Sequence, residues 1–389
     1  MPFRHGIFVS EPATGARPIL PASLAVIGLV ATAPDADAAY FPLNGPALVT
    51  NPRAALAKAG TQGTLAKALA AICDQTTPVI VVVRVAPGVA AGETSVEEAT
   101  DINVIGGVNG NGRYTGLQAL LAAKAKFGVQ PRIIGCPGLD TQPVTAAMVA
   151  VAKKLRGFCY ARCNGAEPVA PSEAIAYRDE FADRELMLIY PDFSGWEGQA
   201  IAVALGTRAR IDEETGWHKT LSNVPVLGVT GMSRDIYFDL SDPSTPAAEL
   251  NAAPVTTLVH QNGYRFWGNR TCSDDERYAF ETSVRTLHAL QDELIKGLAW
   301  AVDKAVTPRL VRDILDSANA RFRTLKAQGR IIGAEAYMDP ALNQADQLAL
   351  GKAQIDIDFT PCPPLEDLGL NMQITDRFLL NFTEQVAAV

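Results

Sequence analysis

The sequence predicts an α/β protein in which a three-layer domain is followed by a smaller α+β unit. The first indication is a regular alternation of helical and strand patterns between residues 64 and 190, which is typical of βαβ units with right-handed crossovers. The second is residues 78–85, which are apolar on both faces, as a central parallel strand is. The third is an extended, proline-punctuated segment at each end of the chain, which predicts two arms.

The N-terminal residues predict the first arm. Residues 6–10 have the pattern of a short strand, and Pro12, Pro18 and Pro21 then prevent a helix because proline lacks a backbone donor. Residues 24–30 are apolar throughout and predict a buried strand that ends in a polar loop at residues 34–37.

The next part of the chain repeats a helix followed by a strand. The expected helices are residues 64–74, 116–126, 144–155 and 171–181, and the expected strands are residues 78–85, 131–135, 158–161 and 185–190. Parallel strands need long crossover connections, so this order predicts one sheet with helices on both faces.

The pattern changes after about residue 212. Residues 214–222 are polar and turn-rich, residues 239–254 predict a linker or surface loop, and residues 255–259 predict a strand. Two long helices follow, one at residues 276–302 with a single apolar stripe and one from Pro308 to residue 328 with Thr307 as its cap. A strand at 331–338, a short helix at 343–350 and a strand at 355–359 complete the α+β unit.

The last residues of the chain carry a second arm. Residues 361–364 (PCPP) stop the preceding strand, residues 370–375 then alternate between apolar and polar side chains, and residues 378–382 are mostly apolar. A terminal strand this apolar must pair with a sheet, either in its own chain or in a neighbour, and the pattern leaves both open. Pairing with a neighbour is head-to-tail and builds rings or filaments.

Length and composition exclude several classes of protein. A chain of 389 residues predicts two or three domains. Its net charge of −8 argues against nucleic-acid binding, which needs a basic face. No apolar run reaches the roughly 18 residues that cross a bilayer, and the first residues lack the apolar core of a signal peptide. The six scattered cysteines predict mostly buried thiols, with Cys362 the one that could be exposed and pair across subunits.

The glycine-rich loop at residues 110–116 is the nearest approach to a nucleotide-binding loop. Gly110, Gly112 and Gly116 precede an expected helix, and Asp140 follows the next strand, where a ribose-binding acid would lie. The spacing is GxGxxxG rather than GxGxxG, and a helix start explains the glycines without a ligand. A nucleotide-dependent α/β enzyme is therefore kept as the alternative function.

No other group of residues predicts catalysis or a metal. The four histidines have no second ligand at metal spacing, Cys159 and Cys163 have no partner pair, and Ser194 lacks the GxSxG elbow. The acidic residues 274–276 fit the first turn of a helix, where carboxylates complement the helix dipole. We therefore expect a protein that is not an enzyme and has no cofactor and no metal.

Several segments follow one another in the order found in a known family. They are residues 6–9, 15–19 and 26–28, the helix start at 115–121, the turn at 214–217 with 222–223, and residues 300–303 and 374–376. The most specific is GYRFWGNRT at residues 263–271, whose motif side chains are Tyr264, Phe266, Trp267, Gly268, Asn269 and Arg270. Over nearly its full length the chain resembles the tail sheath proteins of contractile phage tails and R-type pyocins, in particular their P2-like branch.

The resemblance implies an inserted three-layer α/β outer domain plus a C-terminal α+β inner domain, with extended N- and C-terminal arms. Residues 1–25 would form the N-terminal arm and first strand and join the inner domain. Residues 26–254 would form the outer domain, residues 255–371 the conserved inner domain, and residues 372–389 the strand of the C-terminal arm.

The resemblance also implies an assembly. Subunits would stack as hexameric rings around an inner tail tube and contract by rigid-body rearrangement, which drives the tube through the target cell envelope. Each arm would add a strand to a neighbour's sheet, through Ile7, Phe8 and Val9 at the N-terminus. At the C-terminus the residues are Ile374, Asp376, Arg377, Phe378, Leu380 and Phe382. Asp346 and Lys352 are expected near the contact with the tube.

The implied partners are further copies of the chain, the inner tail tube protein, and the baseplate and tail terminator proteins, with no nucleic acid and no membrane insertion. The implied location is the virion tail or a released pyocin-like particle, after synthesis in the bacterial host cytoplasm. A sheath of a non-phage contractile injection system remains the second alternative.

Overall fold

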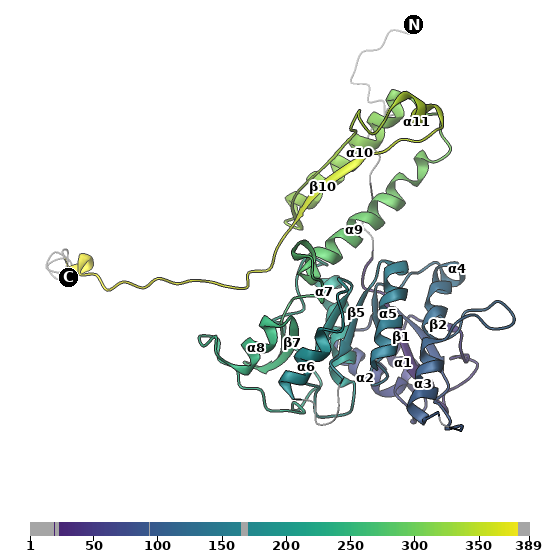
Figure 1. Ribbon diagram of the computed structural model, residues 1–389, viewed down its shortest axis with the longest axis vertical. Helices are drawn as coiled ribbons and strands as arrows, with labels where there is room; N and C mark the ends of the chain where they lie inside the picture. The colour runs from purple at the N-terminus through teal and green to yellow at the C-terminus, as the bar shows by residue number, and fades with distance from the viewer. Residues whose placement is uncertain (1–18, 20–22, 93, 165–169, 380–389) are drawn as a thin grey trace, which may run out of the picture.

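The computed structural model describes residues 19, 23–92, 94–164 and 170–379 (Figure 1). An eight-stranded sheet, in the order β2-β3-β1-β4-β5-β6-β7-β8, forms the centre of a body that extends to residue 280. The six inner strands are parallel, and the edge strands β2 and β8 are antiparallel to their neighbours. In chain order the strands are β1 (Ile27–Thr32), β2 (Pro46–Val49), β3 (Ile80–Val85), β4 (Ile133–Gly135), β5 (Phe158–Arg162), β6 (Leu186–Ile189), β7 (Val255–His260) and β8 (Tyr264–Trp267).

Helices cover both faces of this sheet and create two separate apolar cores. Successive side chains of a strand point to opposite faces, so Ile27 and Leu29 of β1 belong to one core and Val26 and Val30 to the other. The first core is closed by α2 (Leu65–Gln75) and α7 (Gln199–Glu214). The second is closed by η2 (Gly116–Ala122), α5 (Gln142–Leu155), α6 (Pro171–Arg178) and α8 (Pro246–Ala252). The body is therefore a three-layer α/β unit, as predicted.

Shorter helices complete the body. They are α1 (Pro52–Ala55), η1 (Leu56–Lys58), α3 (Val96–Ile105), α4 (Ala123–Phe127) and η3 (Glu276–Tyr278). Within the described residues, no helix is both long enough and apolar enough to cross a membrane.

Residues 281–361 form a second part, here called the projection, which extends away from the body (Figure 1). Its elements are α9 (Glu281–Leu298), η4 (Ala299–Ala301), α10 (Pro308–Ala327), β9 (Ile331–Tyr337), α11 (Ala345–Ala349) and β10 (Asp356–Pro361). The side chain of Thr307 accepts a hydrogen bond from the N–H of Leu310, so the predicted cap begins α10. The antiparallel pair β9 and β10 packs through its apolar face on α10, with Phe322, Leu325 and Ala336 in the shared core.

Two described residues that precede β1, Ile19 and Leu24, contact the projection. Ile19 is buried against Gly297 of α9, where an added Cβ would lie 2.6 Å from the Ile19 side chain. Leu24 belongs to the apolar core of the projection, and β1 begins only three residues later, at Ile27. The segment before β1 is thus attached to the projection.

The structure departs from the sequence-based expectations at several elements and decides one point that they left open. The edge strand β2 and the helix α7 were not predicted, and α8 occupies part of the expected loop at 239–254. The expected helix at 116–126 is a 3₁₀ turn followed by the short helix α4. The boundary expected at residue 255 falls inside the large sheet, because β7 pairs with β6 and β8 with β7. Residues 370–376 form no strand in this chain, and Arg377–Leu379 forms a 3₁₀ turn, η5.

Candidate assembly interface

The C-terminal extension, residues 362–379, leaves the end of β10 and runs away from the rest of the molecule (Figure 1). Its apolar side chains alternate with polar or small residues and are between 66% and 102% exposed: Leu368, Leu370, Met372 and Ile374. This is the period-two pattern of a strand with one face to bury, yet residues 362–376 belong to no sheet of the described chain. The alternation assigns Ile374 to the apolar face of this stretch.

The two-stranded sheet β9–β10 is the matching feature of the projection. Its pairing joins Ile357 to Ala336 and Phe359 to Ala334, and these four side chains contribute to the core under α10. Within the described residues each strand has one neighbour, so the outer edges of β9 and β10 both present backbone groups that no described strand pairs with. A sheet this small, with two open edges and one covered face, can accept further strands.

The solvent-facing side of the same sheet is acidic. Asp358 lies directly opposite Glu335, and Asp356 lies opposite Tyr337. The charge of Asp358 raises the pKa of the Tyr337 hydroxyl. Like charges directly opposite each other destabilise a strand pair, so this face is better suited to meet basic groups of another chain than to stand alone.

Buried ion pairs hold α9 against the body. Asp292 of α9 pairs with Arg132, which precedes β4, and with Arg156 at the end of α5 (Nε to Oδ1, 2.8 Å). Asp292 is 1% exposed and Arg132 is 3% exposed. Burial lowers the pKa of Arg132 to about 10, and the charge of Asp292 opposes that shift. Removing one member would leave the other charged, buried and without its partner. The cluster therefore fixes the orientation of α9 relative to the body.

A second buried cluster lies at the start of α9. Arg208 of α7 is fully buried and donates to Asp212 (Nη2 to Oδ1, 2.8 Å) and to Glu281 (Nη1 to Oε1, 3.3 Å). Glu281 also accepts from the Tyr160 hydroxyl, and Arg285 pairs with Asp212. Burial raises the pKa of Tyr160. The cluster joins α7, β5 and α9, so the base of the projection is part of the body's own packing.

Most side chains of the motif at residues 263–271 contact other parts of the same chain and stabilise its fold. Phe266 is fully buried in the sheet, and the Tyr264 hydroxyl donates to the carbonyl of Thr230 (2.9 Å). Gly268 has φ +139°, and a Cβ there would lie 2.8 Å from the backbone of Thr256, so only glycine fits. Trp267 packs edge-on against Phe238, and Asn269 accepts the N–H of Glu281 on its carbonyl.

Arg270, the last side chain of the motif, has a different role. Its guanidinium pairs with Glu366 of the C-terminal extension through two hydrogen bonds, Nε to Oε1 at 3.0 Å and Nη2 to Oε2 at 2.6 Å. These two residues are 96 positions apart. The sequence analysis singled out Arg270 but had no signal for its partner.

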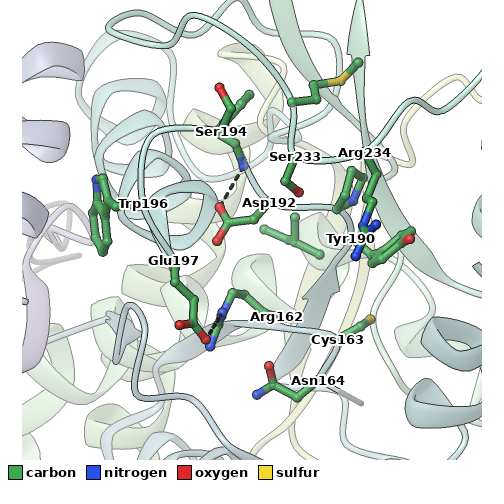
Figure 2. A pocket seen from close by; sticks show the side chains of 14 residues that line it. Arg162, Cys163, Asn164, Tyr190, Asp192, Ser194, Trp196, Glu197, Ser233 and Arg234 are labelled. Carbon is green, nitrogen blue, oxygen red and sulfur yellow. Dashed lines mark hydrogen bonds and ion pairs between the residues drawn. The ribbon is translucent and has the colours of Figure 1, made fainter. Parts of the chain in front are cut away.

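A surface pocket lies at the carboxyl ends of β5 and β6, and Figure 2 shows Arg162 and Glu197 pointing toward each other across it. Arg162 donates to Asp140 (Nε to Oδ1) and to Glu197 (Nη1 to Oε1), both at 2.9 Å. Asp192 accepts backbone N–H groups at the start of α7, while burial raises its pKa. These charges hold β5 to α7, and among the described residues that line the pocket no histidine stands near Ser194.

The loop at residues 110–116 lacks the setting of a nucleotide loop. It follows the helix α3 rather than a strand, and a 3₁₀ turn comes after it. Gly116 has φ +54°, and a Cβ there would meet the carbonyl of Val104 at 2.4 Å, so packing on α3 explains this glycine. Gly110 and Gly112 face open space. Within the described residues no group of three His, Cys, Asp or Glu is placed to hold a metal ion.

Comparison with known proteins gives one consistent answer. The model of the phage tail sheath protein central domain matches residues 112–272, that of the phage tail sheath C-terminal domain matches residues 273–375, and that of the tail sheath protein Gp18 domain III N-terminal region matches residues 25–85. The chain is 48% identical to the tail sheath protein of Escherichia phage P2 over 99% of this chain and 98% of that protein. The chain belongs to the phage tail sheath protein family.

Other sheath proteins are also similar. The major tail sheath protein of Serratia phage KSP20 is 44% identical over 97% of this chain and 96% of that protein. A putative prophage major tail sheath protein of Pseudomonas aeruginosa (strain UCBPP-PA14) is 40% identical over 97% of this chain and 98% of that protein.

Solved structures support the fold. The helical sheath of the anti-feeding prophage in its contracted state superposes with a TM-score of 0.71 at 17% identity, over 96% of this chain and 99% of that chain. The sheath complex of an extracellular contractile injection system, PVC, in its contracted state gives a TM-score of 0.69 at 14% identity, over 96% of this chain and 98% of that chain.

The remaining predicted sheath residues are placed as follows. Asp346 lies in α11 and Lys352 just after it, both exposed at the far end of the projection (Figure 1). Ile374, Asp376 and Arg377 lie in the exposed C-terminal extension, and Phe378 lies in η5. Five predicted arm residues lie outside the described residues: Ile7, Phe8, Val9, Leu380 and Phe382. Their roles between subunits stay predictions.

Proposed function

We propose that the chain is the structural subunit of a contractile tail sheath and that its copies are linked by exchange of strands from their terminal arms. The observation that carries the proposal is the coexistence, in one chain, of an unpaired strand-like extension and a two-stranded sheet with two open edges. Strand addition supplies backbone hydrogen bonds at every step, and side-chain contacts select the register.

The proline-rich segment explains why the extension does not fill its own sheet. Pro363 and Pro364 follow Pro361, the last residue of β10, and none of them has an N–H to donate to a ladder. The chain therefore leaves the sheet at Pro361 and cannot pair with the outer edge of β10 without a long return. A second copy provides the nearest acceptor that needs no such return.

Burial of the apolar face supplies the free energy. Fully burying a Leu, Ile or Met side chain contributes about 1.5–3 kcal/mol. Leu368, Leu370, Met372 and Ile374 share one face and are exposed in the single chain, so each can contribute in the assembly. A head-to-tail contact of this kind repeats from subunit to subunit, which produces rings and helical tubes.

The finer features of the proposal follow from the same geometry. The buried clusters at Asp292 and Arg208 make the projection rigid with the body, so contraction proceeds by rigid-body movement while the arms keep subunits connected. The tip of the projection, near Asp346 and Lys352, is proposed to face the inner tail tube. The sheath would surround that tube in hexameric rings, between baseplate and tail terminator proteins, in a virion tail or a related injection particle.

Electron microscopy of the protein expressed alone tests the proposal. We expect hollow cylinders of uniform width, and we expect deletion of residues 375–389 to leave a folded protein that forms none. Ile374→Asp, on the apolar face, should also abolish cylinders, whereas Gln373→Asp, its neighbour on the polar face, should preserve them. Normal cylinders from Ile374→Asp would refute exchange through the apolar face of residues 368–374, and normal cylinders from the deletion would refute a role of residues 375–389 in it.

A further inference from the structure

The pair Arg270–Glu366 joins the body to the chain that leads into the C-terminal arm. Both hydrogen bonds of the pair are present, and the arginine and glutamate side chains are 40% and 34% exposed. Hydrogen bonds to Glu366 raise the pKa of Arg270. Two parallel hydrogen bonds between a guanidinium and a carboxylate fix the relative orientation of the two side chains, which a surface ion pair with a single contact does not.

Arg270 is held in place before it meets Glu366. Its guanidinium lies over the ring of Phe280, 5.3 Å from the ring centroid, and the backbones of the two residues form an isolated bridge. The next residue, Thr271, is buried, and its hydroxyl donates to the carbonyl of Tyr278 (2.7 Å). The arginine therefore stands on a rigid corner of the body, and a cation over an aromatic face keeps its plane oriented.

The chain on either side of Glu366 differs in its surroundings. Before it, Cys362 still lies against the projection, with its Sγ 3.5 Å from the carbonyl of Gly329. Leu365, directly before Glu366, is already 76% exposed, and the apolar side chains from Leu368 to Ile374 after it are exposed as well, so the pair with Arg270 is the contact that holds this stretch to the body. Glu366 is thus the point at which the extension separates from the body.

We propose that Arg270 and Glu366 form a clamp that fixes the root of the C-terminal arm to the subunit's own body and so limits the reach of the arm. With the clamp closed, residues 367–376 can span at most about 35 Å, whereas release back to Pro361 lets residues 362–376 span about 50 Å. The clamp therefore sets both the direction in which the arm leaves and the distance at which a second copy can accept it. That last step rests on the proposed function, while the clamp itself does not.

Distance measurements between spin labels test the clamp directly. The labels are placed at Glu249→Cys on α8 and Leu368→Cys on the extension, both exposed, in the full chain with Cys362→Ser. Labelled protein is diluted with unlabelled protein, so that only distances within one subunit are measured. We expect one narrow distance distribution, because the clamp holds the root of the arm.

Variants on both sides of the pair decide the outcome. Arg270→Glu and, independently, Glu366→Arg should broaden the distribution and extend it to longer distances, and the double variant R270E/E366R should restore the narrow distribution. Glu366→Gln avoids any disturbance of the body and should broaden it as well. Asp367→Arg is the matched control, because it makes the same charge change one position along the exposed extension, and it should leave the distribution narrow.

Three results would overturn the clamp. They are a broad distribution in the native protein, an unchanged distribution in Glu366→Arg, and equal broadening by Asp367→Arg. The clamp and the proposed function fail separately, since deletion of residues 375–389 tests assembly and leaves Glu366 in place, whereas the label distances test the clamp whether or not cylinders form.

Discussion

The large sheet of the body and the small sheet of the projection are built from the same backbone hydrogen bonds, but they differ in how many of their faces and edges are covered. In the body, each of the six inner strands of the sheet has a neighbour on both edges, and helices cover both faces of the sheet. In the projection, β9 and β10 have one neighbour each among the described strands, and α10 covers one face of the pair. The first sheet has both faces covered and ends in the short edge strands β2 and β8, while the second has one face covered and no strand that is not an edge strand.

The difference shows how one chain can serve as a rigid body and a connector at once. Helices bury both faces of the body's sheet, so the packing of the body cannot rearrange without unfolding. The projection is joined to it by buried ion pairs at Asp292 and Arg208, so its small sheet is presented at a fixed angle.

The largest expected difference between the two sheets is in the free energy of unfolding that is lost when a phenylalanine in each is replaced by alanine. Phe158 of β5 is 1% exposed, and Phe158→Ala should lower the free energy of unfolding by about 3–5 kcal/mol, since it leaves a cavity between two rigid layers. Phe359 of β10 is only partly buried, so Phe359→Ala should cost less than half as much. Denaturant titration of the two variants measures both values.

The same two variants should rank in the reverse order in assembly. Phe359→Ala should weaken cylinder formation more than its small effect on folding explains, because a neighbour's strand would complete the cover over this side chain. Equal costs of folding for the two substitutions would mean that the small sheet is as complete as the large one.

The boundary between the two regions should respond to pH through His288 of α9. Burial, with the nearby charges of Arg285 and Arg184, lowers its pKa to about 3, and Glu185 lies 4.0 Å from its Nε2. The unfolded state, with a pKa near 6.5, binds the proton first, so this contribution to stability is complete above pH 6.5 and is lost as the pH falls. Between about pH 6.5 and pH 5 the expected loss is about 2 kcal/mol.

Denaturant midpoints at pH 7 and pH 5 measure this loss. His288→Gln cannot take up the proton, so its stability should vary less with pH over the same window than that of the native chain. An identical pH dependence in the two proteins would show that His288 is not buried in its neutral form.

The smallest effect on folding is expected at the exposed face of β9. Ile332 is 56% exposed, and Ile332→Ser should change the free energy of unfolding by no more than about 0.5 kcal/mol. It should nevertheless reduce the yield of cylinders. Leu240→Ser, at a similarly exposed leucine in a loop of the body, serves as the control and should affect neither folding nor assembly. Equal cylinder yields from the two variants would argue against a subunit contact at β9.

Elements whose signals lie within a few residues were predicted correctly. The apolar run that forms β3, the cap Thr307 and the alternation of β10 all appear where the sequence placed them. The helix α7 was missed because it packs both on the sheet and against α2, so most of its side chains are buried and the amphipathic pattern of a surface helix is absent. The domain boundary was misplaced because strand membership in a sheet depends on pairing between distant segments.

Some features of the candidate interface could likewise be predicted from the sequence, and others could not. The sequence by itself determined that residues 370–375 alternate as a strand does, that prolines separate them from β10, and that residues 263–271 form a motif. These features depend on side-chain period and local backbone chemistry. Only the tertiary structure decided that the small sheet has two open edges, that Asp292 meets Arg132 in a buried pair, and that Arg270 meets Glu366. These contacts join residues far apart in the chain, and their formation depends on how the whole chain closes on itself rather than on any local pattern.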